Sequence, residues 1–330
     1  MEENRSWIQI IRNNVVYIVI VVYVFYFWVN LNSEEYFDDL LYELCGDSAS
    51  LQFVVVVYGG TIWSILILLL ICLFGRKNRF ILRSFLPKGK GRKHKVYVVE
   101  DTYKPTQNNT VKMLLLGLLI GFVTNFICIA CAMIHGDISL YFEFDSGQIP
   151  LFLLALLLVL VQSSSEEMWI RGFMYERILI HYPLWVAIAV NGVFFGLLHL
   201  FNPGVTFLSI LNIILIGMVF SLIRWYTGSI WAAIGWHTMW NFTQNFIFGL
   251  PNSGVVSEFS LYHMESQNAE SNLIYDYDFG VEGAIILTLI STLFIVVILL
   301  LAKRKGRLGE LRMSYEKMRS EQRGNADDRG

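Results

Sequence analysis

Long apolar runs, separated by short polar and charged segments, dominate this chain of 330 residues. A helix needs ~20 largely apolar residues to cross the roughly 30 Å hydrocarbon core of a bilayer. Eight runs qualify, at about 14–30, 51–74, 112–134, 149–170, 184–202, 205–225, 229–248 and 282–302. Backbone polar groups in lipid must be satisfied within the segment itself, so these runs predict helices. The expected fold is all-α, a polytopic membrane helix bundle of about eight transmembrane helices.

Composition and charge agree with a membrane protein and suggest its orientation. Hydrophobic residues make up 55% of the chain and charged residues 16%, against roughly 25% charged residues in soluble domains. Residues 76–95 carry nine Lys or Arg and no acid, whereas residues 33–47 and 250–282 each carry six acids and no Lys or Arg. Positive loops stay in the cytosol, so both termini are predicted to be cytosolic, in the plasma membrane if the source is a bacterium. The basic segments are interpreted as contacts with membrane lipids, and no nucleic-acid partner is expected.

Three regions follow from this layout. Residues 1–110 are predicted to hold two N-terminal transmembrane helices and a basic cytosolic loop, residues 111–250 a helix bundle with embedded polar residues between 166 and 241, and residues 251–330 an outer loop, the last transmembrane helix and a basic cytosolic tail. Cys128 and Cys131 have the spacing of a redox or zinc motif, but they lie in an apolar helix without a partner pair, which favours simple packing. The sequence carries no signal for an oligomeric state.

Ionisable side chains inside a membrane span are costly and usually functional. Those within or beside the predicted spans are Glu166, Glu167, Arg171, Glu176, Arg177, His199, Arg224 and His237, and the embedded amides are Asn191, Asn212, Asn241 and Asn245. Glu167 and Arg171 are four residues apart, so they share a helix face and can pair. Glu166 points about 100° away from Glu167 and can face a cavity. The alternative is that this stretch is only the solvated cytosolic mouth of the fourth span.

Each of the two histidines belongs to a polar stripe on a predicted helix. The stripes are Asn191, Phe195 and His199, and His237, Asn241 and Asn245, all at spacings of four residues. A lone histidine in an apolar helix is more often a core residue satisfied by one hydrogen bond than a catalytic group. A histidine and an amide on one face need partners, however, because an unsatisfied polar group in lipid costs several kcal/mol.

The spacing about Pro183 predicts that Glu166 and His199 lie level with each other. Glu166 is 17 residues before this turn and His199 is 16 residues after it, and residues equidistant from the turn of an antiparallel helix pair lie side by side. His237 is about ten residues beyond the next cytosolic turn, or roughly 15 Å along its helix. The three groups meet only if the fourth helix continues to about His181; otherwise His199 would lie near the outer face.

These three motifs together resemble those of the CAAX protease and bacteriocin-processing family of intramembrane proteases, which includes the type II CAAX prenyl endopeptidases. The matching residues, in this order on successive helices, are Glu166-Glu167-x-x-x-Arg171, Phe195-x-x-x-His199 and His237-x-x-x-Asn241. The resemblance covers about residues 145–250. It implies an intramembrane endopeptidase that hydrolyses a peptide bond of a membrane-associated, prenylated or leader-peptide substrate.

The resemblance also assigns expected roles to the matching residues. Glu166 is similar to the general base that activates a water, and His199 to its partner in positioning that water or the oxyanion. His237 and Asn241 resemble the residues that complete the polar lining of the active site, with Asn241 as an oxyanion donor. Glu167 and Arg171 resemble the pair that fixes the first motif. Zinc is the implied metal, with Glu166, His199 and His237 as candidate ligands; a Glu-activated water without any cofactor is the alternative.

Two other classes of function remain open from the sequence. One is a non-catalytic membrane immunity or scaffold protein that retains the protease fold. The intact set of three motifs favours the enzyme, because a scaffold has no need of buried Glu and His residues. The other is a transporter with a proton relay, which is disfavoured because no inverted repeat or pair of broken helices is visible in the sequence.

Overall fold

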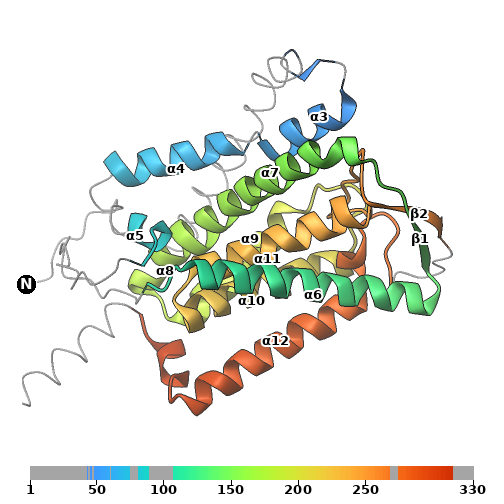
Figure 1. Ribbon diagram of the computed structural model, residues 1–330. Coiled ribbons are helices and arrows are strands. Elements are labelled where there is room, and N and C mark those ends of the chain that lie inside the picture. Colours follow the sequence, from blue (N-terminus) through green and yellow to red (C-terminus); the bar gives the residue numbers. More distant parts are fainter. Residues whose placement is uncertain are drawn as a thin grey trace, which may run out of the picture.

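The computed structural model describes residues 48–59, 61–74, 81–88, 107–267 and 274–314, together with Glu43, Cys45 and Gly46. The helices are α3 (Ala49–Val54), α4 (Ile62–Phe74), α5 (Leu82–Phe85), α6 (Val111–His135), α7 (Ile149–Glu167), α8 (Tyr175–His181), α9 (Leu184–Leu198), α10 (Phe207–Thr227), α11 (Ile230–Phe242) and α12 (Ile285–Arg304). Short π-helical segments cover Val55–Gly59, Met168–Met174 and Thr243–Ile247, and the strands are β1 (Ile138–Phe142) and β2 (Tyr262–Gln267). The long helices lie alongside one another as a bundle (Figure 1).

Five helices among the described residues are long and apolar enough to cross a membrane. They are Ala49–Phe74, Val111–His135, Ser146–His181, Phe207–Thr227 and Ile285–Arg304. These helices indicate an integral, multi-pass membrane protein. The predicted number of eight is therefore wrong for the described part of the chain, and the run at about 14–30 lies outside it.

Two predicted spans differ from the prediction for identifiable reasons. The run at 184–202 forms the shorter helix α9, which ends at Leu198 because Pro203 and Gly204, the latter at φ +69°, belong to the following turn. The run at 229–248 is helical through α11 and the π-helical segment Thr243–Ile247. It does not qualify as a span because its second half carries many polar side chains.

The long helix that holds the two adjacent glutamates continues to His181, as the sequence-based alignment of Glu166 with His199 requires. It is α-helical from Ile149 to Glu167, π-helical over Met168–Met174 and α-helical again in α8. A π-helical turn inside an α-helix is rare and is frequently found at functional sites. Here it begins at the residue after Glu167 and contains Arg171.

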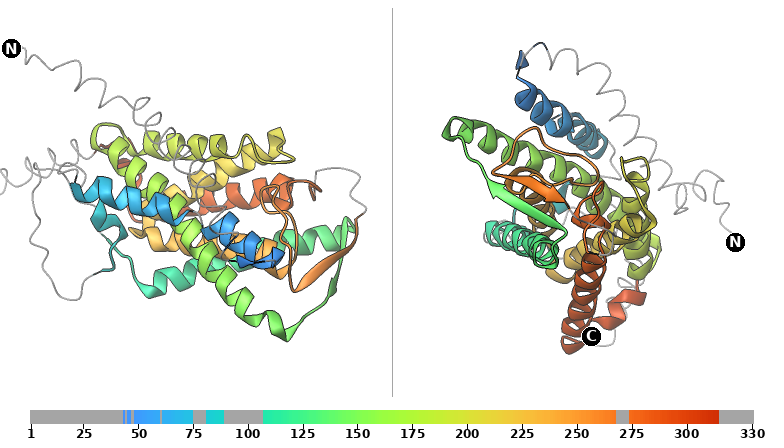
Figure 2. Two further views of the ribbon diagram at one scale, coloured as in Figure 1. Left: turned by 90° about the horizontal axis from the view of Figure 1, so that it is seen from above. Right: turned by 90° about the vertical axis from the view of Figure 1, so that its right-hand side faces the viewer.

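A two-stranded sheet corrects the prediction of an all-α fold. β1 pairs antiparallel with β2, with Ile138 opposite Gln267 and Phe142 opposite Tyr262, and the sheet lies at one end of the bundle (Figures 1 and 2). Gly136, in the left-handed region at φ +92°, ends α6 and lets the chain turn into β1. The strands are more than 100 residues apart in sequence, so no local sequence pattern indicates that they pair.

Glycines bring α6 and α11 into direct backbone contact. A Cβ atom on Gly117 would collide with the carbonyl oxygen of Ala232, one on Gly121 with that of Trp236, and one on Gly235 with that of Leu114. Small residues at four-residue spacing are the usual device for close helix approach in membranes. The Gly117-x-x-x-Gly121 spacing is a readable signal that the sequence analysis missed. The contact fixes α11, the helix that carries His237.

We expect Gly121→Ala to destabilise the protein by about 1–3 kcal/mol, the usual cost of forcing extra atoms into a packed interior. Gly59→Ala is the matched control, since a Cβ atom there would meet only side-chain atoms at 3.7–3.9 Å. Thermal unfolding of both variants in the same detergent is the measurement. Equal stability of the two variants would contradict the close contact between α6 and α11.

Candidate active site

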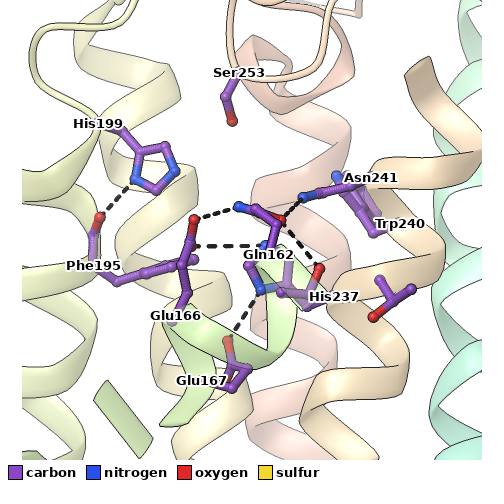
Figure 3. A network of polar contacts seen from close by, with 12 residues as sticks. Gln162, Glu166, Glu167, Phe195, His199, His237, Trp240, Asn241 and Ser253 are labelled. Atoms are coloured by element: carbon purple, nitrogen blue, oxygen red, sulfur yellow. Dashed lines mark hydrogen bonds and ion pairs between the residues drawn. The ribbon is translucent and has the colours of Figure 1, made fainter. Parts of the chain in front are cut away.

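The residues of the three sequence motifs converge in the interior of the bundle (Figure 3). Glu166 and Glu167 are the last two residues of α7, His199 caps the C-terminus of α9, and His237 and Asn241 lie on α11. Glu166, Glu167, His237 and Asn241 are buried, and His199 is partly buried. Residues more than 70 positions apart therefore form one polar cluster.

Glu167 and Arg171 form the fully buried ion pair that their spacing predicts. Arg171 Nη1 donates to Glu167 Oε1 at 2.9 Å, and neither side chain is exposed. Arg171 Nη2 also donates to the carbonyl oxygen of Gly217 at 3.1 Å. Its guanidinium lies over the ring of Phe195, 4.3 Å from the centroid, and near that of Phe220 at 5.3 Å. The pair thus ties the helix of the glutamates to α9 and α10.

His237 lies between the two glutamates. Its Nδ1 atom is 3.2 Å from Glu167 Oε1, and its Nε2 atom is 3.9 Å from Glu166 Oε2. Because the Glu167 carboxylate that pairs with Arg171 can only accept a hydrogen bond, Nδ1 is the nitrogen that donates to it, and Nε2 is the nitrogen that lies toward Glu166. Glu167 therefore fixes the orientation of His237 as well as that of Arg171.

Glu166 is held by a residue outside the three motifs. Gln162, one helical turn before it, donates from Nε2 to Glu166 Oε1 and accepts from Asn241 Nδ2 at 3.3 Å. Glu166 Oε2 has no hydrogen-bond partner among the described residues. Gln162 was missed in the sequence analysis, although it lies on the face of Glu166 at the spacing that identified the other pairs.

His199 faces the cluster with its second ring nitrogen. Its Nδ1 atom is 2.8 Å from the carbonyl oxygen of Phe195, and a carbonyl only accepts, so Nδ1 is the protonated nitrogen and Nε2 is left for other partners. The Phe195 ring lies 5.0 Å from the ring of His199 and 5.7 Å from that of His237. Phe195 therefore supports both histidines. Within the described part of the chain, no direct hydrogen bond or ion pair joins His199 to Glu166.

Other embedded polar residues lie away from the cluster and stabilise the bundle. Glu176 pairs with Arg224 at 2.8 Å in a second buried ion pair. Asn191 donates to the carbonyl oxygen of Ala187 within its own helix. Asn245 accepts from the hydroxyl of Tyr58 at 3.1 Å. Only some of the embedded polar residues that the sequence indicates therefore belong to the candidate site.

Glu166, His199 and His237 are the candidate zinc ligands that the resemblance implies. Among the described residues, no group of three or more His, Cys, Asp or Glu side chains is arranged to hold a metal ion. The arrangement of Glu166, His199 and His237 does not fit a three-ligand zinc site as it stands. Zinc binding stays a prediction from the resemblance.

Comparison with known proteins adds to this geometry. Residues 148–243 match the model of the Rce1-like family, described as type II CAAX prenyl endopeptidase. The chain is also similar to the uncharacterized protein YyaK of Bacillus subtilis (strain 168), with 29% identity over 153 residues. That similarity covers 43% of this chain and 50% of the relative, so the chain spans about half the length of the curated relative it matches.

No solved structure matches this chain significantly. The matched segment contains both glutamates, both site histidines and Asn241. Residues 148–243 of this chain, which hold the candidate site, are therefore similar to the Rce1-like type II CAAX prenyl endopeptidase family.

Proposed function

We propose that this protein is an intramembrane endopeptidase in which Glu166 activates a water to hydrolyse a peptide bond. The observation that carries the proposal is the state of the Glu166 carboxylate. Oε1 accepts from Gln162, whereas the buried Oε2 has no partner among the described residues and lies 3.9 Å from His237 Nε2. A polar separation of this length suits one bridging water. Such a water is the nucleophile of the proposed reaction.

The proton transfers of the proposed reaction need only side chains of the cluster. Glu166 takes a proton as the water oxygen attacks the carbonyl carbon, and the same proton later passes to the departing amine when the C–N bond breaks. The tetrahedral oxyanion is stabilised by N–H donors, for which Asn241 Nδ2 and a protonated histidine are the candidates. Gln162 fixes Asn241 and Glu166 relative to each other because it hydrogen-bonds to both.

The substrate class follows from where the cluster lies. A site among membrane-spanning helices is reached by a peptide that is itself held at the membrane. A prenylated CAAX peptide and a leader peptide with an apolar segment both meet this requirement, and a bacterial source would favour the leader peptide. A non-catalytic immunity or scaffold protein is the competing proposal.

The experiment compares cleavage by the wild-type protein with cleavage by Glu166→Gln in liposomes. Two substrates are offered, a prenylated peptide ending in a CAAX sequence and an apolar leader peptide. We expect a new N-terminus in one of them with the wild-type protein only. Cleavage of neither substrate, at normal folded protein level, would favour the scaffold function.

We further propose that both termini face the cytosol. The loop charges support this orientation, and Lys88 and Glu258 are exposed reporter positions on the two predicted sides. In a background without native cysteines, Glu258→Cys should react with a membrane-impermeant thiol reagent in intact cells, and Lys88→Cys should react only after lysis. The reverse pattern would invert the proposed topology.

A further inference from the structure

Helix α9 is shorter than its neighbour α10, and another segment of the chain packs next to His199 at its C-terminal end. With 15 residues, α9 is about 22 Å long, whereas α10 with 21 residues is about 32 Å long. The segment that follows α11 packs against the turn after His199. Asn202 Nδ2 donates to the carbonyl oxygen of Ser253 at 2.9 Å, and a Cβ atom on Gly254 would collide with the carbonyl oxygen of Pro203.

Glu282, in the turn before α12, is buried where these segments meet. Its Oε2 atom accepts from the backbone N–H of Ser253 at 2.6 Å and from the Ser253 hydroxyl at 2.5 Å. Its Oε1 atom accepts from the indole Nε1–H of Trp240 at 2.9 Å. Asn212 of α10 holds the backbone of this turn, donating to the carbonyl oxygens of Glu282 and Ala284 at 2.9 and 2.8 Å.

The cost of burying this carboxylate indicates that it has a specific use. No Lys or Arg forms an ion pair with it among the described residues. Burial raises the pKa of the Glu282 carboxyl, while the hydrogen bonds from Ser253 and Trp240 act in the opposite direction. A buried acid held by three neutral donors is expensive compared with an apolar residue.

The contacts of Glu282 lead to both walls of the candidate active site. Trp240 directly precedes Asn241 and lies three residues after His237 on α11. Ser253 is bonded to Asn202, whose backbone N–H donates to the carbonyl oxygen of His199 at 3.2 Å. In Figure 3, Trp240 lies beside Asn241, and Ser253 lies at the top of the view, at the end of the cluster where His199 is drawn.

We propose that Glu282 is a positioning residue for this site: by holding Trp240 and Ser253 together, it fixes His199 relative to His237 and Asn241. The inference rests on the proposed function. It assigns a role to a residue outside the segment 148–243 that matches the family. It also gives the segment between α11 and α12 a part in the reaction.

The geometry allows a specific double-substitution test. In Glu282→Gln, the amide oxygen can still accept from Ser253, but the amide N–H₂ then meets the indole N–H of Trp240, donor against donor. Because a 1 Å misplacement can cost ~10²-fold in rate, we expect kcat to fall about 10–100-fold with KM little changed. Trp240→Phe removes the opposing donor, so the double variant should recover part of the kcat lost in Glu282→Gln.

Controls separate positioning from folding. Asp276→Asn is the matched control, because Asp276 is a buried acid of the same segment whose side chain, among the described residues, accepts only from the backbone of Asp278 and Phe279. All variants are purified in detergent, and their folded fraction is measured by thermal unfolding. We expect Asp276→Asn to keep the wild-type kcat.

The possible outcomes are distinct. A wild-type kcat per folded Glu282→Gln molecule, a change confined to KM, or no recovery in the double variant would overturn the role of Glu282. If the wild-type protein itself cleaves no better than Glu166→Gln, the proposed function has failed, and this inference with it. Wild-type cleavage with unaffected Glu282 variants would overturn the inference alone.

Discussion

Replacement of Glu166 by Gln is expected to lower peptide cleavage by about 10²–10⁴-fold, the usual contribution of a positioned general base. Glutamine has nearly the same size and keeps an oxygen for the Gln162 amide to donate to. It offers no carboxylate at the Oε2 position, which accepts no hydrogen bond from any of the described residues and lies 3.9 Å from His237 Nε2. The folded protein should therefore be unchanged while the proton acceptor is lost.

His199→Ala and His237→Ala should lower cleavage similarly, and their combination with Glu166→Gln should be little worse than any one alone. Groups that act on the same reacting atoms as a unit are not additive. If the loss of activity in the combined variant equals the product of the separate losses, the histidines act independently of Glu166.

The measurement is the initial rate of cleavage in liposomes, per folded molecule, with metal content determined on the same preparations. Glu143→Gln is the matched control, because Glu143 is an exposed carboxylate outside the cluster. Full activity of Glu166→Gln at normal protein level would end the proposed mechanism. Activity in a preparation without stoichiometric metal would leave the water activated by Glu166 alone.

Replacement of the neighbouring Glu167 should differ in kind, because it destabilises the protein as well as inactivating it. Glu167→Ala removes the partner of the fully buried Arg171 and the acceptor that orients His237. Removing one partner of a buried ion pair costs about 3–5 kcal/mol, since the remaining charge is left without compensation. We expect little folded protein, and that fraction should be inactive.

A double substitution separates the two effects. In Glu167→Met/Arg171→Met, no buried charge is left unpaired, and such replacements are often neutral for stability. We expect much of the folded protein to return without activity, because His237 still lacks its acceptor. Thermal unfolding and cleavage are measured on the single and double variants. Recovery of activity together with stability would show that the pair serves folding only.

Much of the candidate site could be predicted from the sequence because its signals are local. Glu167 and Arg171 pair as their four-residue spacing predicts. The requirement that the helix continue to His181 is confirmed as well. Gln162 and the glycines Gly117 and Gly121 carried the same kind of local signal, although the sequence analysis did not use it.

The partners of each site residue could not be predicted in this way. Sequence spacing suggested that His199 is the close partner of Glu166, whereas in the structure His237 lies between both glutamates. The role of Glu282 depends on contacts with Trp240 and Ser253, 42 and 29 residues away. Nothing in the local pattern of either segment indicates these contacts.

The sequence by itself determined the membrane class, most of the helices and most of the residues from which the candidate site is built. These properties follow from hydropathy and helical periodicity, which act over one or two turns of a single segment. The tertiary structure alone decided the number of long apolar spans, the pairing of β1 with β2, the backbone contact of α6 with α11 and the placement of Glu282. Each of these depends on how two segments distant in sequence pack together, and packing is set by the shapes of both surfaces at once.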